Sequence, residues 1–98
     1  MIKKLNKTDD FKEVIKTGKW LVDFSATWCG PCRMLEPVLE ELGTSYNILK
    51  VDVDEFQELA QEFVVMSVPT LILFNDGQKI NQTIGFIPKD ALEKFINN

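Results

Sequence analysis

The chain has 98 residues, of which 15 are acidic and 11 basic, so its formal net charge is −4 at neutral pH. A chain of this size predicts one domain, residues 1–98, with a folded surface of about 5,700 Å². The acidic balance and the lack of a basic cluster argue against nucleic-acid and membrane-surface binding. No apolar run reaches the length of a membrane span, and residues 1–7 turn polar too early for a secretory signal, so we expect a cytoplasmic protein.

The apolar pattern predicts alternating strands and helices. The expected strands are a weak one over residues 2–5, a buried one over 20–24, one over 48–53, and the two strands of a hairpin over 70–74 and 80–84. The expected helices between and after them cover residues 8–18, 31–43, 54–63 and 88–96. Asp54 is expected to cap the third helix and Pro88 to open the last. Turn formers at residues 75–78 predict the hairpin.

This order predicts an α/β fold with a single mixed sheet. A strand, a helix and a strand joined by short links form a parallel crossover, whereas the hairpin is antiparallel. We therefore expect a central sheet of five strands, and at least four, flanked by four helices.

The sequence holds two cysteines, Cys29 and Cys32, and no histidine. The missing histidine excludes Ser-His-Asp triads, Cys-His pairs and most zinc sites, which leaves cysteine, carboxylate and lysine side chains for chemistry. The spacing of the two cysteines is typical of a redox pair. Half of a metal site in a bridged dimer, or an inert structural disulfide, would show the same spacing.

Cys29 follows a buried strand and stands at the start of a helix. The positive end of a helix stabilises a thiolate, so Cys29 is predicted to be the nucleophile in thiol–disulfide exchange. Cys32, one turn further along, is predicted to be less exposed, to stay protonated and to resolve the mixed disulfide. Both sulfurs share one helical face, which lets a disulfide close with little backbone motion.

The resolving step needs a proton acceptor near Cys32, and Asp23 is the carboxylate in the adjacent apolar strand. Burial there predicts a raised pKa, which suits proton transfer. Alternatively, Asp23 faces outward, or it only pairs with a cation such as Lys50 on the neighbouring strand. The dipeptide Gly30-Pro31 adds no donor that would stabilise the thiolate further, so the pair is predicted to be a strong reductant.

The segment Trp28-Cys29-Gly30-Pro31-Cys32 resembles the active-site motif of thioredoxins, and residues 22–27 resemble the strand that precedes it. The resemblance covers essentially the whole chain, with Lys50 where the family has a lysine near the buried aspartate. It implies the thioredoxin fold and a protein-disulfide reductase, with Lys50 assisting Asp23. A disulfide oxidase or isomerase of the same fold, or a non-catalytic binding module that uses the same surface, are the alternatives.

The resemblance also implies a docking surface around the cysteines. Pro69 is implied to be cis, although the proline alone would favour a trans bond, and the backbone of residues 68–70 would pair with an extended substrate segment. The residues implied to bind substrate are Trp28, Gly30, Pro31, Val68, Pro69, Thr70, Gly85 and Phe86. For Trp28 and Phe86 the alternative is ordinary packing.

Partners follow from the resemblance alone. It implies a monomer that reduces disulfide-containing proteins, binds no cofactor or metal, and carries its electrons in a Cys29–Cys32 disulfide. NADPH would supply these electrons through a flavin-dependent thioredoxin reductase. The sequence departs from the family pattern at Ser25, often aromatic, at Val64, often glycine, and at Pro88, often a capping serine or threonine.

Overall fold

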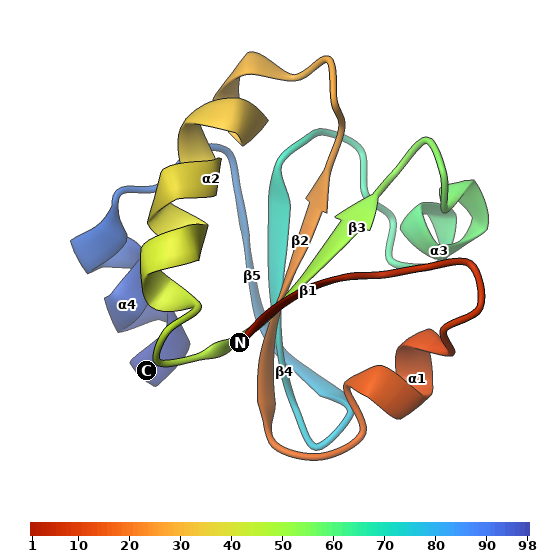
Figure 1. Cartoon of the computed structure of the whole chain (residues 1–98), viewed down its shortest axis with the longest axis horizontal. Coiled ribbons are helices and arrows are strands. Elements are labelled where there is room, and N and C mark those ends of the chain that lie inside the picture. Colours follow the sequence, from red (N-terminus) through yellow and green to blue (C-terminus); the bar gives the residue numbers. More distant parts are fainter.

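A five-stranded sheet forms the centre of the computed structural model, which describes residues 1–98 (Figure 1). The elements are β1 (Ile2–Lys4), α1 (Phe11–Val14), β2 (Lys19–Ser25), α2 (Gly30–Leu42), β3 (Asn47–Asp52), α3 (Gln57–Glu62), β4 (Thr70–Asn75), β5 (Gln78–Ile84) and α4 (Lys89–Asn97). The strand order is β1-β3-β2-β4-β5, with β1, β3 and β2 parallel and β4 and β5 antiparallel to their neighbours. The predicted mixed sheet, including its weak first strand, is confirmed. None of the four helices has the length and apolar character of a membrane span.

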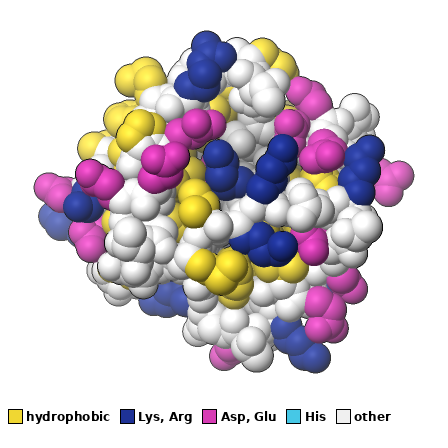
Figure 2. Space-filling view, viewed as in Figure 1, with side chains coloured by type: hydrophobic (Ala, Val, Ile, Leu, Met, Phe, Trp, Pro, Cys, Tyr) yellow, Lys and Arg dark blue, Asp and Glu magenta, His cyan; other side chains and the backbone are white.

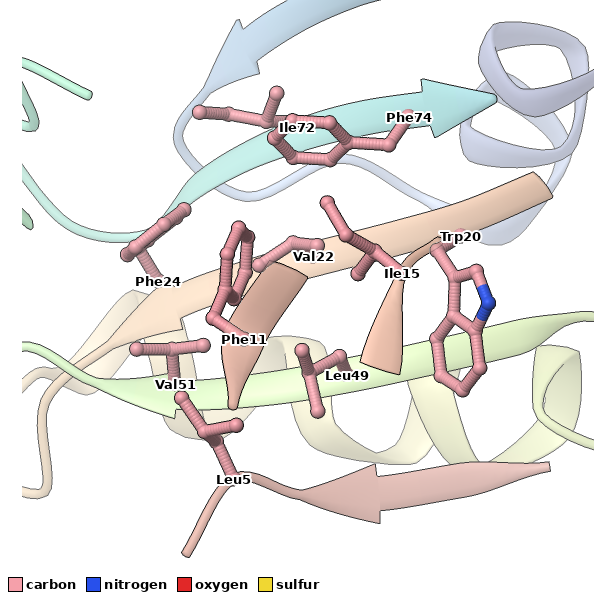
Figure 3. Packing of buried hydrophobic residues seen from close by; sticks show 10 residues of the cluster. All are labelled: Leu5, Phe11, Ile15, Trp20, Val22, Phe24, Leu49, Val51, Ile72 and Phe74. Carbon is pink, nitrogen blue, oxygen red and sulfur yellow. The ribbon is translucent and has the colours of Figure 1, made fainter. Parts of the chain in front are cut away.

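Helices cover both faces of the sheet, with α2 and α4 on one side and α1 and α3 on the other (Figure 1). Because side chains alternate along a strand, each strand supplies both cores. Figure 3 shows the core under α1 and α3, made of Leu5, Phe11, Ile15, Trp20, Val22, Phe24, Leu49, Val51, Ile72 and Phe74. The core under α2 and α4 holds Leu21, Leu35, Leu39, Leu42, Ile48, Leu71, Leu73, Leu92 and Ile96. The folded surface is 5671 Å², close to the value expected for one domain.

The first helix is shorter than predicted, because hydrogen bonds hold the residues after it in another conformation. It begins after Asp10, whose side chain accepts the N–H of Lys12 at 3.1 Å, and it ends at Val14. The Trp20 indole then donates to the carbonyl of Thr17 at 3.2 Å, which holds the following residues in a turn that leads into β2. The N–H of Gly18 donates to Oδ1 of Asp76 at 2.7 Å, and the N–H of Asp76 donates to the carbonyl of Gly18 at 2.9 Å.

Asp54 does not cap the third helix, contrary to the prediction. The N–H groups of Asp54 and Glu55 instead donate to the side chain of Asp52, at 2.8 and 3.3 Å. This local turn delays the helix until Gln57 and turns Asp54 toward the site described below.

Val64 stands where the family often has glycine, and the structure shows why glycine is favoured there: α3 ends in a motif that normally requires it. The N–H of Val64 donates to Gln61 and that of Val65 donates to Ala60, which together form a Schellman motif. Val64 has φ +54°, in the left-handed region, where a β-branched side chain is strained.

Candidate functional site

Cys29 and Cys32 form a disulfide at the N-terminus of α2, with their Cα atoms 5.2 Å apart. Cys29 is the N-cap residue, and its Sγ accepts the N–H of Cys32 at 3.2 Å. The helix therefore directs an unpaired backbone donor and its positive end at the sulfur of Cys29. The two cysteines are almost equally buried, at 5% and 4% exposed, so the predicted difference in exposure is not present in the disulfide.

What distinguishes the two cysteines is the chemistry on either side of the disulfide. Cys29 lines an apolar groove of about 510 Å³, and Cys32 lines a separate polar cavity of about 180 Å³. The walls of the groove are Trp28, Cys29, Gly30, Pro31, Val53, Val65, Met66, Ser67 and Val68. Those of the cavity are Lys4, Ser25, Ala26, Thr27, Cys32, Glu36, Lys50 and Asp52.

The loop before β4 forms the wall of the groove opposite Cys29. The Val68–Pro69 peptide bond is cis, as the resemblance implied, and the carbonyl oxygen of Val68 lies 3.6 Å from Sγ of Cys29. Gly85 donates its N–H to the carbonyl of Pro69 at 2.8 Å. Its φ of +93° favours glycine, and a Cβ atom there would meet nothing within 4 Å, so the backbone at this position is open to an approaching chain.

Two of the predicted docking residues expose aromatic side chains, Trp28 in the wall of the groove and Phe86 directly after Gly85. Trp28 is 66% exposed and Phe86 is 41% exposed, so neither is accounted for by core packing alone. The indole N–H of Trp28 donates to Oδ2 of Asp54 at 2.8 Å, which fixes the ring beside the disulfide. Thr70, in contrast, is buried, and its hydroxyl donates to the carbonyl of Ser67, so its side chain supports the loop from inside.

Met66 was not among the predicted site residues, although it is 86% exposed on the rim of the groove. Val53, Val65 and Ser67 in the groove wall were missed as well. A usable signal was present, since residues 64–66 form an apolar run directly before the Val68-Pro69 loop. Apolar residues between a helix and a strand do not by themselves indicate which way they point.

Asp23 lies on the face of β2 that packs under α2, and it is 1% exposed. Neither of its carboxylate oxygens has a hydrogen-bond partner. Burial raises the pKa of Asp23 to about 7, an effect that the nearby Lys50 ammonium and the Ser25 hydroxyl oppose and the Glu36 carboxylate strengthens. The outward-facing alternative for Asp23 is therefore wrong, and the predicted raised pKa is confirmed.

Lys50 is the neighbour of Asp23 in the register of β2 and β3, yet it does not form an ion pair with Asp23. Its Nζ lies 3.5 Å from Oε1 of Glu36, on α2. Glu36 was also missed in the sequence, although it follows Cys32 by four residues and so shares its helical face. No group of three or more histidine, cysteine or acidic side chains that could hold a metal ion occurs in the structure.

Comparisons with known proteins agree with this geometry. The family model described as thioredoxin matches residues 2–98. A thioredoxin of Staphylococcus aureus is 50% identical over 92 residues, which cover 90% of this chain and 88% of that protein. A solved mutant thioredoxin from Halobacterium salinarum is 38% identical, with a TM-score of 0.90 over 98% of this chain and 88% of that one.

Oxidised mitochondrial thioredoxin 3 from Saccharomyces cerevisiae is 42% identical, with a TM-score of 0.87 over 98% of this chain and 93% of that one. The fold, the disulfide at the start of α2 and the family match all point the same way. The chain belongs to the thioredoxin family, and it is a protein-disulfide reductase whose redox pair is Cys29 and Cys32.

Proposed function

We propose that Cys29 attacks the substrate disulfide and that Cys32 resolves the mixed disulfide. The observation that carries this proposal is the division of surroundings, with Cys29 on the apolar groove and Cys32 on the polar cavity. The Cys29 thiolate attacks one substrate sulfur, the substrate S–S bond breaks, and the other substrate sulfur leaves and takes up a proton. Cys32 then attacks Cys29, which releases the second substrate thiol and forms the Cys29–Cys32 disulfide. Two electrons and two protons pass to the substrate.

The groove binds the segment of substrate that carries the disulfide. The N–H and C=O groups of Val68 take part in no backbone hydrogen bond, so an extended chain can pair with them beside Cys29. Trp28, Gly30 and Pro31 on one side and Val68 and Met66 on the other provide an apolar surface for its side chains. Pro69 and Thr70 hold this loop in place, and Gly85 and Phe86 extend the surface beyond it.

Asp23 takes the proton of Cys32 in the resolving step, with Lys50 assisting through its charge. Asp23 is a buried carboxylate without hydrogen-bond partners, and its register partner Lys50 lines the same cavity as Cys32, so Asp23 has no structural task of its own. Its pKa of about 7 lies close to the pH of the reaction, where a proton acceptor works best. This role requires that Asp23 be ionised when the mixed disulfide is resolved.

The experiment that tests these steps uses Ellman's reagent, an aromatic disulfide. Attack by the first cysteine forms a mixed disulfide with one half of the reagent and releases the other half as coloured thionitrobenzoate. Attack by Cys32 then releases the second thionitrobenzoate, so the slower phase reports the resolving step. Asp23→Asn is expected to slow this phase about 10- to 100-fold and to remove its pH dependence near neutrality. An unchanged slow phase between pH 6 and pH 9 contradicts the role of Asp23.

The protein acts as a cytoplasmic monomer that donates electrons, and it receives them from NADPH through a flavin-dependent thioredoxin reductase. Gly30-Pro31 between the cysteines and the 50% identical thioredoxin support this direction. Equilibration with glutathione is the test, and we expect the dithiol to be the stronger reductant. A potential more oxidising than that of glutathione supports the alternative oxidase or isomerase, whereas undiminished partner binding and cellular function in Cys29→Ser support a binding module.

A further inference from the structure

The cavity beside Cys32 carries four charged side chains that the exchange reaction alone does not explain. Lys4, Lys50 and Asp52 come from the adjacent strands β1 and β3, and Glu36 comes from α2. Lys4 and Lys50 are direct neighbours in the register of β1 and β3. On the face of the molecule seen in Figure 2, basic side chains gather near the middle, with acidic side chains on both sides.

Lys50 stands between two carboxylates of very different exposure. Asp23, its register partner on β2, is buried and has no hydrogen-bond partner. Glu36 is half exposed, and its Oε1 lies 3.5 Å from Nζ of Lys50. An ammonium group keeps part of its hydration when it pairs at the surface with Glu36, and it would lose that hydration on moving inward to Asp23.

We propose that Glu36 is a positioning residue for the resolving step: it binds Lys50 at the cavity beside Cys32 and keeps the ammonium from pairing with Asp23, which stays free to accept the Cys32 proton. The proposal rests on the proposed role of Asp23 in that step. A direct ion pair with Lys50 would stabilise the charged form of Asp23 and make it a weaker base. Glu36 prevents that pairing and also adds a like charge.

The groups that act on the pKa of Asp23 are Lys50 on β3, Glu36 on α2 and the Ser25 hydroxyl on β2 itself, whereas the register partner on β4 is the apolar Leu71. The other charged side chains of the cavity are Lys4 on β1 and Asp52 on β3. Asp52 is already engaged by the N–H groups of two residues in the following turn. Glu36 is thus the acidic group whose removal frees the Lys50 ammonium.

The test is a carbon-13 NMR titration of the Asp23 carboxyl group in the oxidised protein, with Glu36→Gln as the variant. Removing Glu36 releases Lys50 and removes a like charge, so the pKa of Asp23 is expected to fall. Glu40→Gln is the matched control, because Glu40 is exposed one turn further along α2 and forms no ion pair. In this control Asp23 is expected to titrate as in the wild type.

The resolving rate provides the second readout, measured as the slow release of thionitrobenzoate. In Glu36→Gln, Asp23 ionises at lower pH, so the resolving step is expected to be about two- to threefold faster below pH 7. Above pH 7 Asp23 is ionised in both proteins but is a weaker proton acceptor in the variant, so the step is expected to be about two- to threefold slower. In a Lys50→Met background the effect of Glu36→Gln on both readouts is expected to shrink, since only the direct effect of the carboxylate remains. A purely structural role of Glu36 would not produce this crossing pH profile.

The outcomes separate this inference from the function it rests on. If Asp23 titrates in Glu36→Gln as it does in Glu40→Gln, or if the Lys50→Met background leaves the effect undiminished, Glu36 does not act through Lys50. If Asp23→Asn removes the pH dependence while Glu36→Gln leaves the wild-type profile, the positioning role alone is wrong. If Asp23→Asn leaves the profile unchanged, the proposed role of Asp23 is wrong as well. Thermal unfolding of Glu36→Gln checks that replacing this half-exposed side chain leaves the fold intact.

Discussion

The two sides of one disulfide differ more than the two cysteines that form it. Cys29 and Cys32 are three residues apart and equally buried, yet one lines an apolar groove and the other a polar cavity. The groove is built mainly from loops, with Gly30 and Pro31 from the start of α2, whereas the cavity is built mainly from strand ends and the first turns of α2. In the proposed mechanism, substrate docking and proton transfer therefore take place in separate structures.

The most severe way to break this division is to remove the sulfur on the groove side. Cys29→Ser is expected to reduce insulin disulfides no faster than the uncatalysed reaction, because a hydroxyl is not ionised at neutral pH. The assay measures the rate of insulin reduction with dithiothreitol as electron donor, for Cys29→Ser and for the wild type under the same conditions. Residual turnover in Cys29→Ser would mean that Cys32 can act as the nucleophile.

The cavity side predicts a large effect of pH on stability. Unfolded Asp23 has its ordinary pKa of 3.8, whereas the folded state raises that pKa to about 7, so unfolding releases a proton between these values and stability falls as pH rises. The loss reaches roughly 4 kcal/mol by pH 8. Asparagine at this position does not titrate. We therefore expect the free energy of unfolding of Asp23→Asn to match that of the oxidised wild type near pH 4 and to exceed it at pH 8.

Urea titrations of the oxidised proteins at a series of pH values measure this difference. Asp90→Asn removes an exposed carboxylate in the first turn of α4 and is expected to follow the wild type. Parallel stability curves for the wild type and Asp23→Asn would contradict the buried, unpaired state of Asp23.

The groove side predicts a smaller effect that appears only with large substrates. Trp28→Ala removes a 66% exposed ring beside Cys29, so KM for a protein disulfide is expected to rise about 5- to 10-fold. Reaction with Ellman's reagent, which does not need the groove, is expected to stay within about twofold of the wild type. Asp54→Asn, which weakens the hydrogen bond to the indole, is the milder control. Equal losses with both substrates would place Trp28 in the chemistry itself.

The smallest effect concerns the helix that precedes the groove loop. Val64→Gly relieves the left-handed backbone at the end of α3 but increases the freedom of the unfolded chain, so a net gain of about 0.5–1 kcal/mol is expected. Val64→Ala keeps an unfavourable side chain there and is expected to gain less. Urea unfolding measures both, and a loss of stability in Val64→Gly would contradict the strain.

The sequence predicted the sheet and its helices because the apolar periodicities of the strands and of α2 are clear. It misplaced the ends of α1 and α3, where the side chains of Trp20 and Asp52 form hydrogen bonds with backbone groups two or three residues away. The apolar pattern does not include such polar contacts. The cap expected from Asp54 was wrong for the same reason, since Trp28 binds that carboxylate.

The candidate site was predicted best where the chemistry is local. The cysteine spacing and the buried position of Asp23 both follow from the order of residues along one strand and one helix. The ion-pair partner of Lys50 does not follow from the order of residues. Strand register places Lys50 beside Asp23, but Glu36 pairs with Lys50 because α2 packs on the sheet. Met66 was missed because its exposure depends on the path of a loop.

The most direct test of the division between the cysteines is to trap the mixed disulfide. Cys32→Ser, mixed with an oxidised protein substrate, is expected to accumulate a stable covalent complex through Cys29, because the resolving thiol is missing. Non-reducing electrophoresis followed by mass spectrometry of the linked peptides identifies the bond. Accumulation through Cys32 in Cys29→Ser, with none in Cys32→Ser, would contradict the assignment and place substrate on the cavity side.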